Sequence, residues 1–159
     1  MSELASMNAK SMVKLLASEK DMFVFADKVA KAIKNGAIIF LKGSLGAGKT
    51  TFVRGVLRAF GFHGKVKSPT YALLEPYEID QHKIFHFDFY RINSPKELDF
   101  IGVEEYFLPA FICLVEWPEK GESHLPTPDL LFEFTVKNET RELTITAHTK
   151  HGTEMLTQL

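Results

Sequence analysis

The 159-residue chain has one cysteine, four arginines and a formal net charge of only −1. A single cysteine excludes an internal disulfide framework and is typical of a reducing compartment. The near-neutral balance excludes a strongly basic chain and argues against tight unaided binding to a nucleic-acid backbone, although net charge leaves local basic patches open. Cys113 lies within the apolar run Phe111–Val115, so we interpret it as a small buried hydrophobic side chain.

Long apolar runs are also missing. None approaches the roughly 18 residues that a membrane-spanning helix needs, and the N-terminus, with Glu3, Lys10 and Lys14, lacks the apolar segment of a signal peptide. The sequence therefore predicts a cytoplasmic protein without a membrane partner. Its length and its 14 phenylalanines suffice for one domain with its own core. We expect residues 1–12 to form a loose polar tail.

The segment GSLGAGKT at residues 43–50 matches G-x-x-x-x-G-K-[ST], the Walker A pattern of phosphate loops. Its glycines let the backbone curl so that successive N–H groups point at phosphate oxygens. Lys49 would place its charge on the β- and γ-phosphates, and the Thr50 hydroxyl can ligate Mg²⁺. We therefore predict that ATP or GTP binds here with Mg²⁺ as cofactor. The predicted binding residues of this segment are Gly43, Leu45, Gly46, Ala47, Gly48, Lys49, Thr50 and Thr51.

The flanking patterns provide the context that a phosphate loop requires. The apolar run Ala37–Leu41 predicts a strand buried on both faces, and Thr50–Phe60 predicts a helix that ends at Gly61. A further helix is expected over Ser18–Lys34, with Ser18 as its N-cap. The remaining predicted strands are Met12–Ala17, Tyr71–Ile79, Ile84–Tyr90, Ile112–Val115, Leu130–Val136 and Glu142–Ala147.

These elements predict a single α/β domain of the P-loop NTPase kind, with a central mixed sheet, parallel and antiparallel, flanked by helices. We expect strands 71–79 and 84–90 to form an antiparallel hairpin beside the phosphate-loop strand. Strands 130–136 and 142–147 are expected to form an antiparallel edge of the sheet.

A phosphate-loop enzyme needs a second magnesium anchor, usually an acidic residue at the end of a buried strand. Glu116, which directly follows an apolar strand, is the stronger candidate, and Asp88 is the other. His86 and Asp88 share one face of their strand, and we interpret this face as looking into a nucleotide cleft. Trp117 is either a core residue or a gate near the magnesium.

Other functions remain open at this point. The polar connection Lys67–Tyr71 is either a plain Ser-Pro turn or a segment that senses the γ-phosphate. The loop also fits a small-molecule kinase, although the four scattered arginines do not suggest the arginine-rich lid of such enzymes. A third functional class is a binding module whose docking surface depends on bound ATP and in which hydrolysis is incidental.

Several segments match one family together: GSLGAGKTT (43–51), KSPTY (67–71), HFDFYR (86–91), SPKELDFIGVEEYF (94–107) and ICLVEWPE (112–119). In their order and spacing, from about residue 18 to about residue 129, the chain resembles the TsaE (YjeE) family. These are the small P-loop ATPases of bacterial tRNA threonylcarbamoyladenosine (t6A) synthesis. The chain departs from the family's pattern at Ser44, where Asp is frequent, and at Met22, where Thr is usual.

The resemblance implies roles for individual residues. Lys49, Asp88 and Glu116 would be catalytic, with Asp88 on the γ-phosphate side, and Thr50 and Glu116 would hold magnesium. Glu19 or its neighbours would contact the nucleotide base, and Arg141 would approach the nucleotide. The switch-like segment would consist of Ser68, Pro69, Thr70 and Tyr71.

The resemblance also implies a cellular role. TsaE-like proteins hydrolyse ATP weakly alone and act transiently with the TsaB–TsaD complex, which transfers threonylcarbamoyl to adenosine 37 of tRNA. ATP hydrolysis is thought to reset that complex between turnovers, so tRNA would be met only indirectly.

Overall fold

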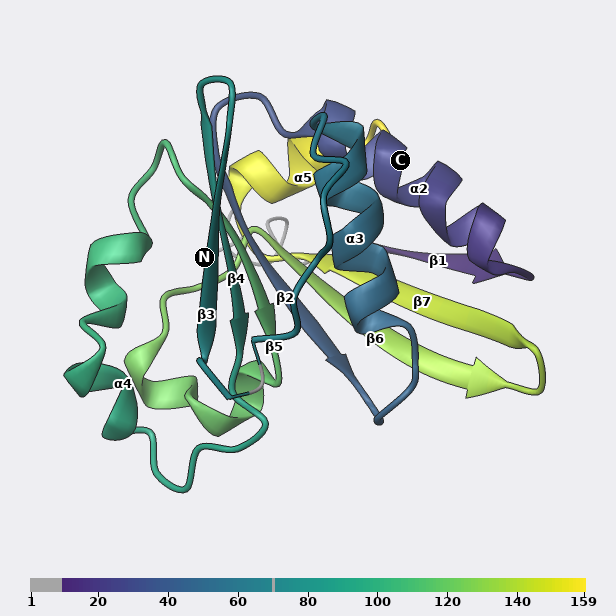
Figure 1. Cartoon of the computed structure of the whole chain (residues 1–159). Coiled ribbons are helices and arrows are strands. Elements are labelled where there is room, and N and C mark those ends of the chain that lie inside the picture. The colour runs from purple at the N-terminus through teal and green to yellow at the C-terminus, as the bar shows by residue number, and fades with distance from the viewer. Residues whose placement is uncertain (1–9, 70) are drawn as a thin grey trace, which may run out of the picture.

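The computed structural model of the chain describes residues 10–69 and 71–159. Within them, seven strands form one mixed sheet in the order β1-β7-β6-β2-β5-β4-β3, flanked by helices on both faces (Figure 1). The predicted α/β fold is therefore confirmed. The strands are β1 (Ser11–Leu16), β2 (Ala37–Gly43), β3 (Leu74–Ile79), β4 (His82–Asp88), β5 (Ile112–Glu116), β6 (Leu130–Lys137) and β7 (Thr140–Ala147). The α-helices are α2 (Glu19–Ala32), α3 (Lys49–Ala59), α4 (Glu97–Phe100) and α5 (Lys150–Leu156).

Helix α2 begins as its sequence predicts. The Ser18 hydroxyl accepts a hydrogen bond from the backbone N–H of Asp21 at 3.1 Å, which satisfies one of the free donors of the first turn. The apolar face of α2 packs on α3, and this contact needs Gly55. A Cβ at Gly55 would lie 2.7 Å from the Cβ of Ala26, so the glycine permits the close approach of the two helices.

Each face of the sheet has its own core. Helices α2, α3 and α5 lie together on one face, where Phe52 and Phe132 have ring centroids 4.9 Å apart (Figure 1). On the other face, α4 and the turns after it enclose a smaller cluster around Phe87 and Leu98. The strands between the two cores are therefore covered on both sides, and all five residues of β5 are buried.

Two expectations about strand order were wrong. The β3–β4 hairpin is antiparallel, but it does not lie beside β2, because β5 pairs in parallel with both β2 and β4. Strand β5, which is apolar up to its last residue Glu116, takes the central place, whereas β3 contains Pro76, which has no N–H for a second ladder and suits an edge strand. The β6–β7 hairpin is not an edge either: β6 pairs in parallel with β2, and β1 covers β7.

Some boundaries also differ from the predicted ones. The hairpin turn is tighter than expected, since Asp80 is left-handed (φ 54°) and β4 already begins at His82. Strand β3 begins at Leu74, three residues later than predicted. Strand β1 begins at Ser11, one residue before the predicted start and within the segment that we assigned to the loose tail. Residues 1–9 of that tail and Thr70 lie outside the described residues.

The topology brings three strand ends to one place. Strands β2, β4 and β5 are mutually parallel, so their carboxyl ends meet at the same edge of the sheet. The register pairs Leu41 with Glu116 and Glu116 with Asp88, directly below the loop between β2 and α3. Among the described residues, no helix has the length and apolar character to cross a bilayer.

Candidate functional site

The loop between β2 and α3 needs its glycines. Gly46 and Gly48 have φ values of 77° and 109°, in the left-handed region that side chains disfavour. At Gly43, a Cβ would lie 2.9 Å from the Cβ of Phe134 on the neighbouring strand β6. The loop leads directly into the 11-residue helix α3 at Lys49. The N–H groups of the first turn of such a helix form a ready site for an anion.

Lys49 is held across this loop and is only 4% exposed. Its ammonium group donates to the carbonyl oxygens of Gly43 and Ser44, and it lies 4.1 Å from the centre of the Trp117 ring. Burial lowers the pKa of Lys49 below its ordinary value, and the nearby carboxylates of Glu116, Asp88 and Glu119 oppose this shift. The site therefore contains one desolvated cation among several carboxylates.

Thr50 and Glu116 join α3 to the end of β5. The Thr50 hydroxyl lies 3.1 Å from Oε2 and 3.3 Å from Oε1 of Glu116, and it donates to this carboxylate. Glu116 is only 3% exposed, and its Oε2 is also 2.6 Å from Nε2 of the fully buried His86. Hydroxyl and carboxylate oxygens are the ligands that Mg²⁺ prefers, so the donor set of Thr50 and Glu116 fits that cation.

These groups converge on a hollow of about 310 Å³ beside the loop. Asp88 reaches it from the end of β4, where its Oδ1 accepts the backbone N–H of Tyr90 at 2.9 Å. The hollow is lined by Leu45, Gly46, Gly48, Lys49, Thr50, Thr51, Ser68, Asp88, Glu116 and Trp117. A single space thus contains a cation, two carboxylates and the start of a helix.

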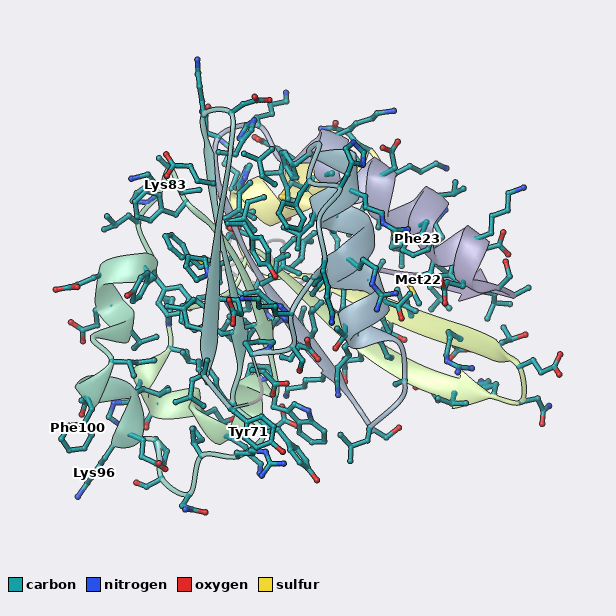
Figure 2. The ribbon with its side chains drawn as sticks, in the orientation of Figure 1. Met22, Phe23, Tyr71, Lys83, Lys96 and Phe100 are labelled. Carbon is teal, nitrogen blue, oxygen red and sulfur yellow. The ribbon has the colours of Figure 1, made fainter. Side chains whose placement is uncertain are left out.

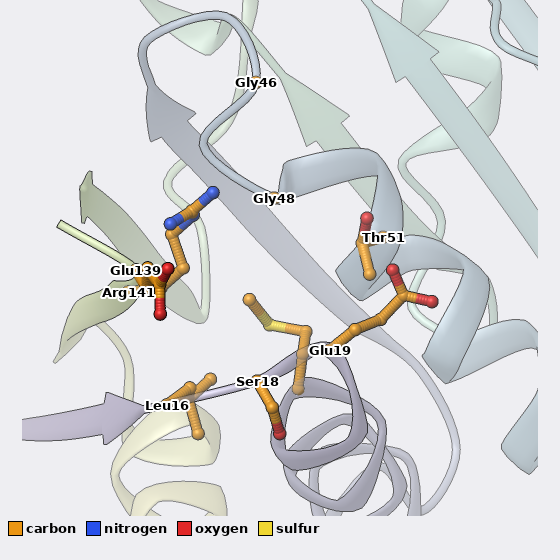
Figure 3. A pocket seen from close by; sticks show the side chains of 9 residues that line it. Leu16, Ser18, Glu19, Gly46, Gly48, Thr51, Glu139 and Arg141 are labelled. Carbon is orange, nitrogen blue, oxygen red and sulfur yellow. The ribbon is translucent and has the colours of Figure 1, made fainter. Parts of the chain in front are cut away.

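A second hollow, of about 150 Å³, lies on the other side of the loop (Figure 3). Glu19 enters it from the first turn of α2, next to Thr51, and the guanidinium of Arg141 extends toward the loop from β7. Gly46 and Gly48 line both hollows. The structure therefore places Glu19 and Arg141, which the family resemblance assigned to the nucleotide, in one hollow with residues of the loop.

The residues of the predicted switch-like segment point in different directions. Ser68 lines the larger hollow. The backbone carbonyl of Pro69 accepts a hydrogen bond from the N–H of Leu73. Tyr71 is 82% exposed and faces away from the core, and Arg91 stacks on its ring at 4.2 Å and donates to its hydroxyl (Figure 2).

One residue lies elsewhere than the sequence suggested. His86 does not look into the cleft: it has no exposed surface and lies behind Glu116, because the helix α3 covers this face of β4. Ala47 is also fully buried, so only its backbone can face a ligand. Asp88 does line the hollow, as expected.

Sequence reasoning missed other residues or left them undecided. Trp117 lines the hollow and packs on the ring of Tyr90, with centroids 5.0 Å apart. Its φ of 57° is rare for a bulky residue, and no sequence pattern announces it. Met22, Leu16 and Glu139 line the second hollow. For Met22, the sequence indicated only a departure from the family's pattern, in which Thr is usual at this position.

Comparisons with known proteins agree with this architecture. The family model described as "Threonylcarbamoyl adenosine biosynthesis protein TsaE" matches residues 16–144. The crystal structure of YdiB from Bacillus subtilis superposes with a TM-score of 0.81 at 27% identity, over 94% of each chain.

Two similar curated proteins have the same description, "tRNA threonylcarbamoyladenosine biosynthesis protein TsaE". The one from Haemophilus influenzae is 39% identical over 92% of this chain and 96% of its own length. The one from Bacillus subtilis is 36% identical over 77% of each chain. A family model that spans most of the chain, and relatives with this identity and coverage, lead to one conclusion: the chain belongs to the TsaE family.

Proposed function

We propose that this protein is a Mg²⁺-dependent ATPase that acts in tRNA threonylcarbamoyladenosine synthesis. One observation carries the proposal: Lys49, Thr50, Asp88 and Glu116 come from three different elements and meet on a single hollow beside the glycine-rich loop. The t6A role comes from the names of the relatives. The choice of ATP over GTP comes from the family resemblance.

In this proposal the loop and the first turn of α3 bind the phosphates, and the base enters the second hollow, where Glu19 and Arg141 lie. Thr50 and Glu116 would hold Mg²⁺, which supplies charge neutralisation for the β- and γ-phosphates. Lys49 stabilises the charge on the transferring phosphoryl group.

Asp88 orients the attacking water and accepts its proton. The water oxygen forms a bond to the γ-phosphorus, and the bond to the bridging oxygen of the β-phosphate breaks. ADP leaves with the electron pair of that bond, together with inorganic phosphate. Trp117 closes one wall of the hollow and limits the access of bulk water to this reaction.

The partner in this proposal is the TsaB–TsaD complex, joined transiently in the cytoplasm, with tRNA met only through that complex. The segment 67–71 is a candidate for signalling nucleotide state to the partner, because Ser68 lines the hollow while Tyr71, three residues later, is exposed.

The test is phosphate release from ATP and Mg²⁺ by Lys49→Ala, with Lys42→Ala as the matched control. Lys42 lies on β2 just before the loop but does not line the phosphate hollow. Two opposite charges 4 Å apart interact by about 4 kcal/mol at an effective dielectric constant of 20, which corresponds to about a thousandfold in rate. We expect Lys49→Ala to lose hydrolysis by about that factor and Lys42→Ala to retain it. Wild-type turnover by Lys49→Ala would refute the proposal.

The same assay with and without the TsaB–TsaD complex distinguishes the alternatives. Strong stimulation by the complex supports a cycling ATPase. Binding that requires ATP but no turnover would favour an ATP-gated binding module. Rapid transfer of phosphate to a metabolite instead of water would favour a kinase.

A further inference from the structure

His86 lies beneath the phosphate hollow without lining it. The side chain has no exposed surface, and its Nε2 is 2.6 Å from Oε2 of Glu116. Since an ionised carboxylate only accepts hydrogen bonds, Nε2 carries the hydrogen and donates it. His86 therefore cannot touch a bound nucleotide, and any effect on the site passes through Glu116.

In the sheet, His86 pairs with the acidic Glu75 of β3 on one side and with the apolar Leu114 of β5 on the other. It stands on the face of β4 that α3 covers, with Ile84 two residues earlier and Leu114 beside it in the register of β5. Its other ring nitrogen, Nδ1, is buried and has no hydrogen-bond partner among residues 10–69 and 71–159. An unpaired buried nitrogen costs free energy. An apolar side chain would fill this position without that cost, so packing alone does not account for a histidine here.

The hydrogen bond gives the two oxygens of Glu116 different surroundings. Oε2 accepts the bond from His86 and has the Thr50 hydroxyl at 3.1 Å, whereas Oε1 has no bond to His86 and lies 3.3 Å from the same hydroxyl. In a buried, low-dielectric place such a hydrogen bond is strong, and no water competes for it. The carboxylate is thus held by His86 through Oε2, which leaves Oε1 beside the Thr50 hydroxyl without a bond to His86.

We propose that His86 is a positioning residue for the divalent cation: it orients the Glu116 carboxylate so that Oε1 and the Thr50 hydroxyl form one preorganised pair of oxygen ligands. This inference rests on the proposed function, because it names a determinant of the same site. Groups that orient metal ligands in this way typically change metal affinity by about 10- to 100-fold when they are lost.

Three variants isolate the hydrogen bond. His86→Phe retains an aromatic ring and removes the donor. His86→Gln retains an N–H that can reach the position of Nε2, whereas His86→Asn has the same amide on a side chain one methylene shorter. Ile84→Val is the matched control, because Ile84 lies on the same strand face and pairs with Ile112, at the opposite end of β5 from Glu116.

The probe is Mn²⁺, titrated into protein saturated with ADP and followed by electron paramagnetic resonance. We expect His86→Phe and His86→Asn to bind Mn²⁺ about 10- to 100-fold more weakly than wild type, while His86→Gln and Ile84→Val stay within about threefold. ADP affinity in EDTA should change by less than about twofold in every variant, since His86 does not reach the nucleotide. A purely structural role would lower Tm and ADP affinity together instead.

Wild-type Mn²⁺ affinity in His86→Phe overturns the inference and leaves the proposed function standing. If the phenylalanine variant does not fold, the Gln and Asn variants decide, and equal Mn²⁺ affinity in these two also overturns it. If the wild-type protein binds no Mn²⁺ in the presence of ADP, the proposed function fails, and this inference fails with it.

Discussion

The hydroxyl of Thr50 makes two separate contributions that one substitution can measure. In Thr50→Val the shape of the side chain stays similar, but the hydrogen bond to Glu116 at 3.1 Å is lost. A hydrogen bond to a charged group contributes about 1.5–3 kcal/mol, and the lower value suits a half-buried hydroxyl whose acceptor retains His86. For a domain of this size, about 1.5 kcal/mol lowers Tm by roughly 3–6 °C.

The second contribution concerns ligand binding. Nucleotide with Mg²⁺ at 100 times its Kd stabilises the wild-type protein by about 2.7 kcal/mol, a rise in Tm of roughly 5–10 °C. Loss of the hydroxyl ligand should weaken this binding by about 10- to 100-fold. At the same ligand concentration the stabilisation then falls to about 0.4–1.4 kcal/mol.

The assay is thermal unfolding of wild type, Thr50→Val and Thr50→Ser, each alone, with ADP in EDTA, and with ADP and Mg²⁺. Thr50→Ser is the matched control, because it retains the hydroxyl and loses only a methyl group. We expect the valine variant to lose about half or more of the increase in Tm that ADP and Mg²⁺ give the wild type, and the serine variant to retain it. An undiminished increase in Thr50→Val would refute the assignment of Thr50 as a magnesium ligand. Equal Tm values for the ligand-free proteins would show that the bond to Glu116 contributes nothing.

Three more predictions follow from single residues. The lowered pKa of Lys49 means that, between that pKa and 10.5, the folded protein binds fewer protons than the unfolded chain, so the free energy of unfolding rises with pH there. Bound phosphates should favour the protonated form of Lys49, so ADP binding in this pH range should take up a proton and weaken as pH rises. Calorimetry in buffers of different ionisation enthalpy measures this uptake, and a binding reaction without proton uptake would contradict the prediction. Burial raises the pKa of Cys113 to about 12, so the thiol should react with a disulfide reagent at pH 8 only on unfolding, and rapid reaction of the native protein would be inconsistent with its burial. Gly152→Ala places a Cβ 1.9 Å from the carbonyl oxygen of Asp129 and should lower the free energy of unfolding by about 3 kcal/mol or more. Gly46→Ala meets open space but has a positive φ, so it should lower that free energy by only about 1–2 kcal/mol. Chemical denaturation measures both values, and equal losses would contradict the steric argument.

The local features of the fold were predictable because each has a local cause. Ser18 starts α2 through a hydrogen bond within its own first turn. The apolar run before Gly43 and the helical spacing after Thr50 specify strand, loop and helix in a row. The same holds for the chemistry of the loop, since Lys49 and Thr50 follow from a short pattern.

Long-range order was less accessible. The sequence of the β3–β4 hairpin does not indicate that β5 lies between this hairpin and β2. The strand order depends on which strand is apolar enough to be buried between the two cores. His86 was misplaced for a related reason. Period-two alternation states which residues share a face, but whether a face is covered by a helix or open to a cleft depends on α3, which comes earlier in the chain.

By itself, the sequence determined the α/β class, the phosphate-loop pattern, the family resemblance and the carboxylates to examine, because these depend on neighbouring residues or on a linear set of motifs. Only the tertiary structure decided that Glu116, Thr50 and His86 touch, that Trp117 covers Lys49, and that Glu19 and Arg141 share one hollow. Those contacts join residues that are far apart in the chain. They depend on strand order and on the side of the sheet where each helix packs.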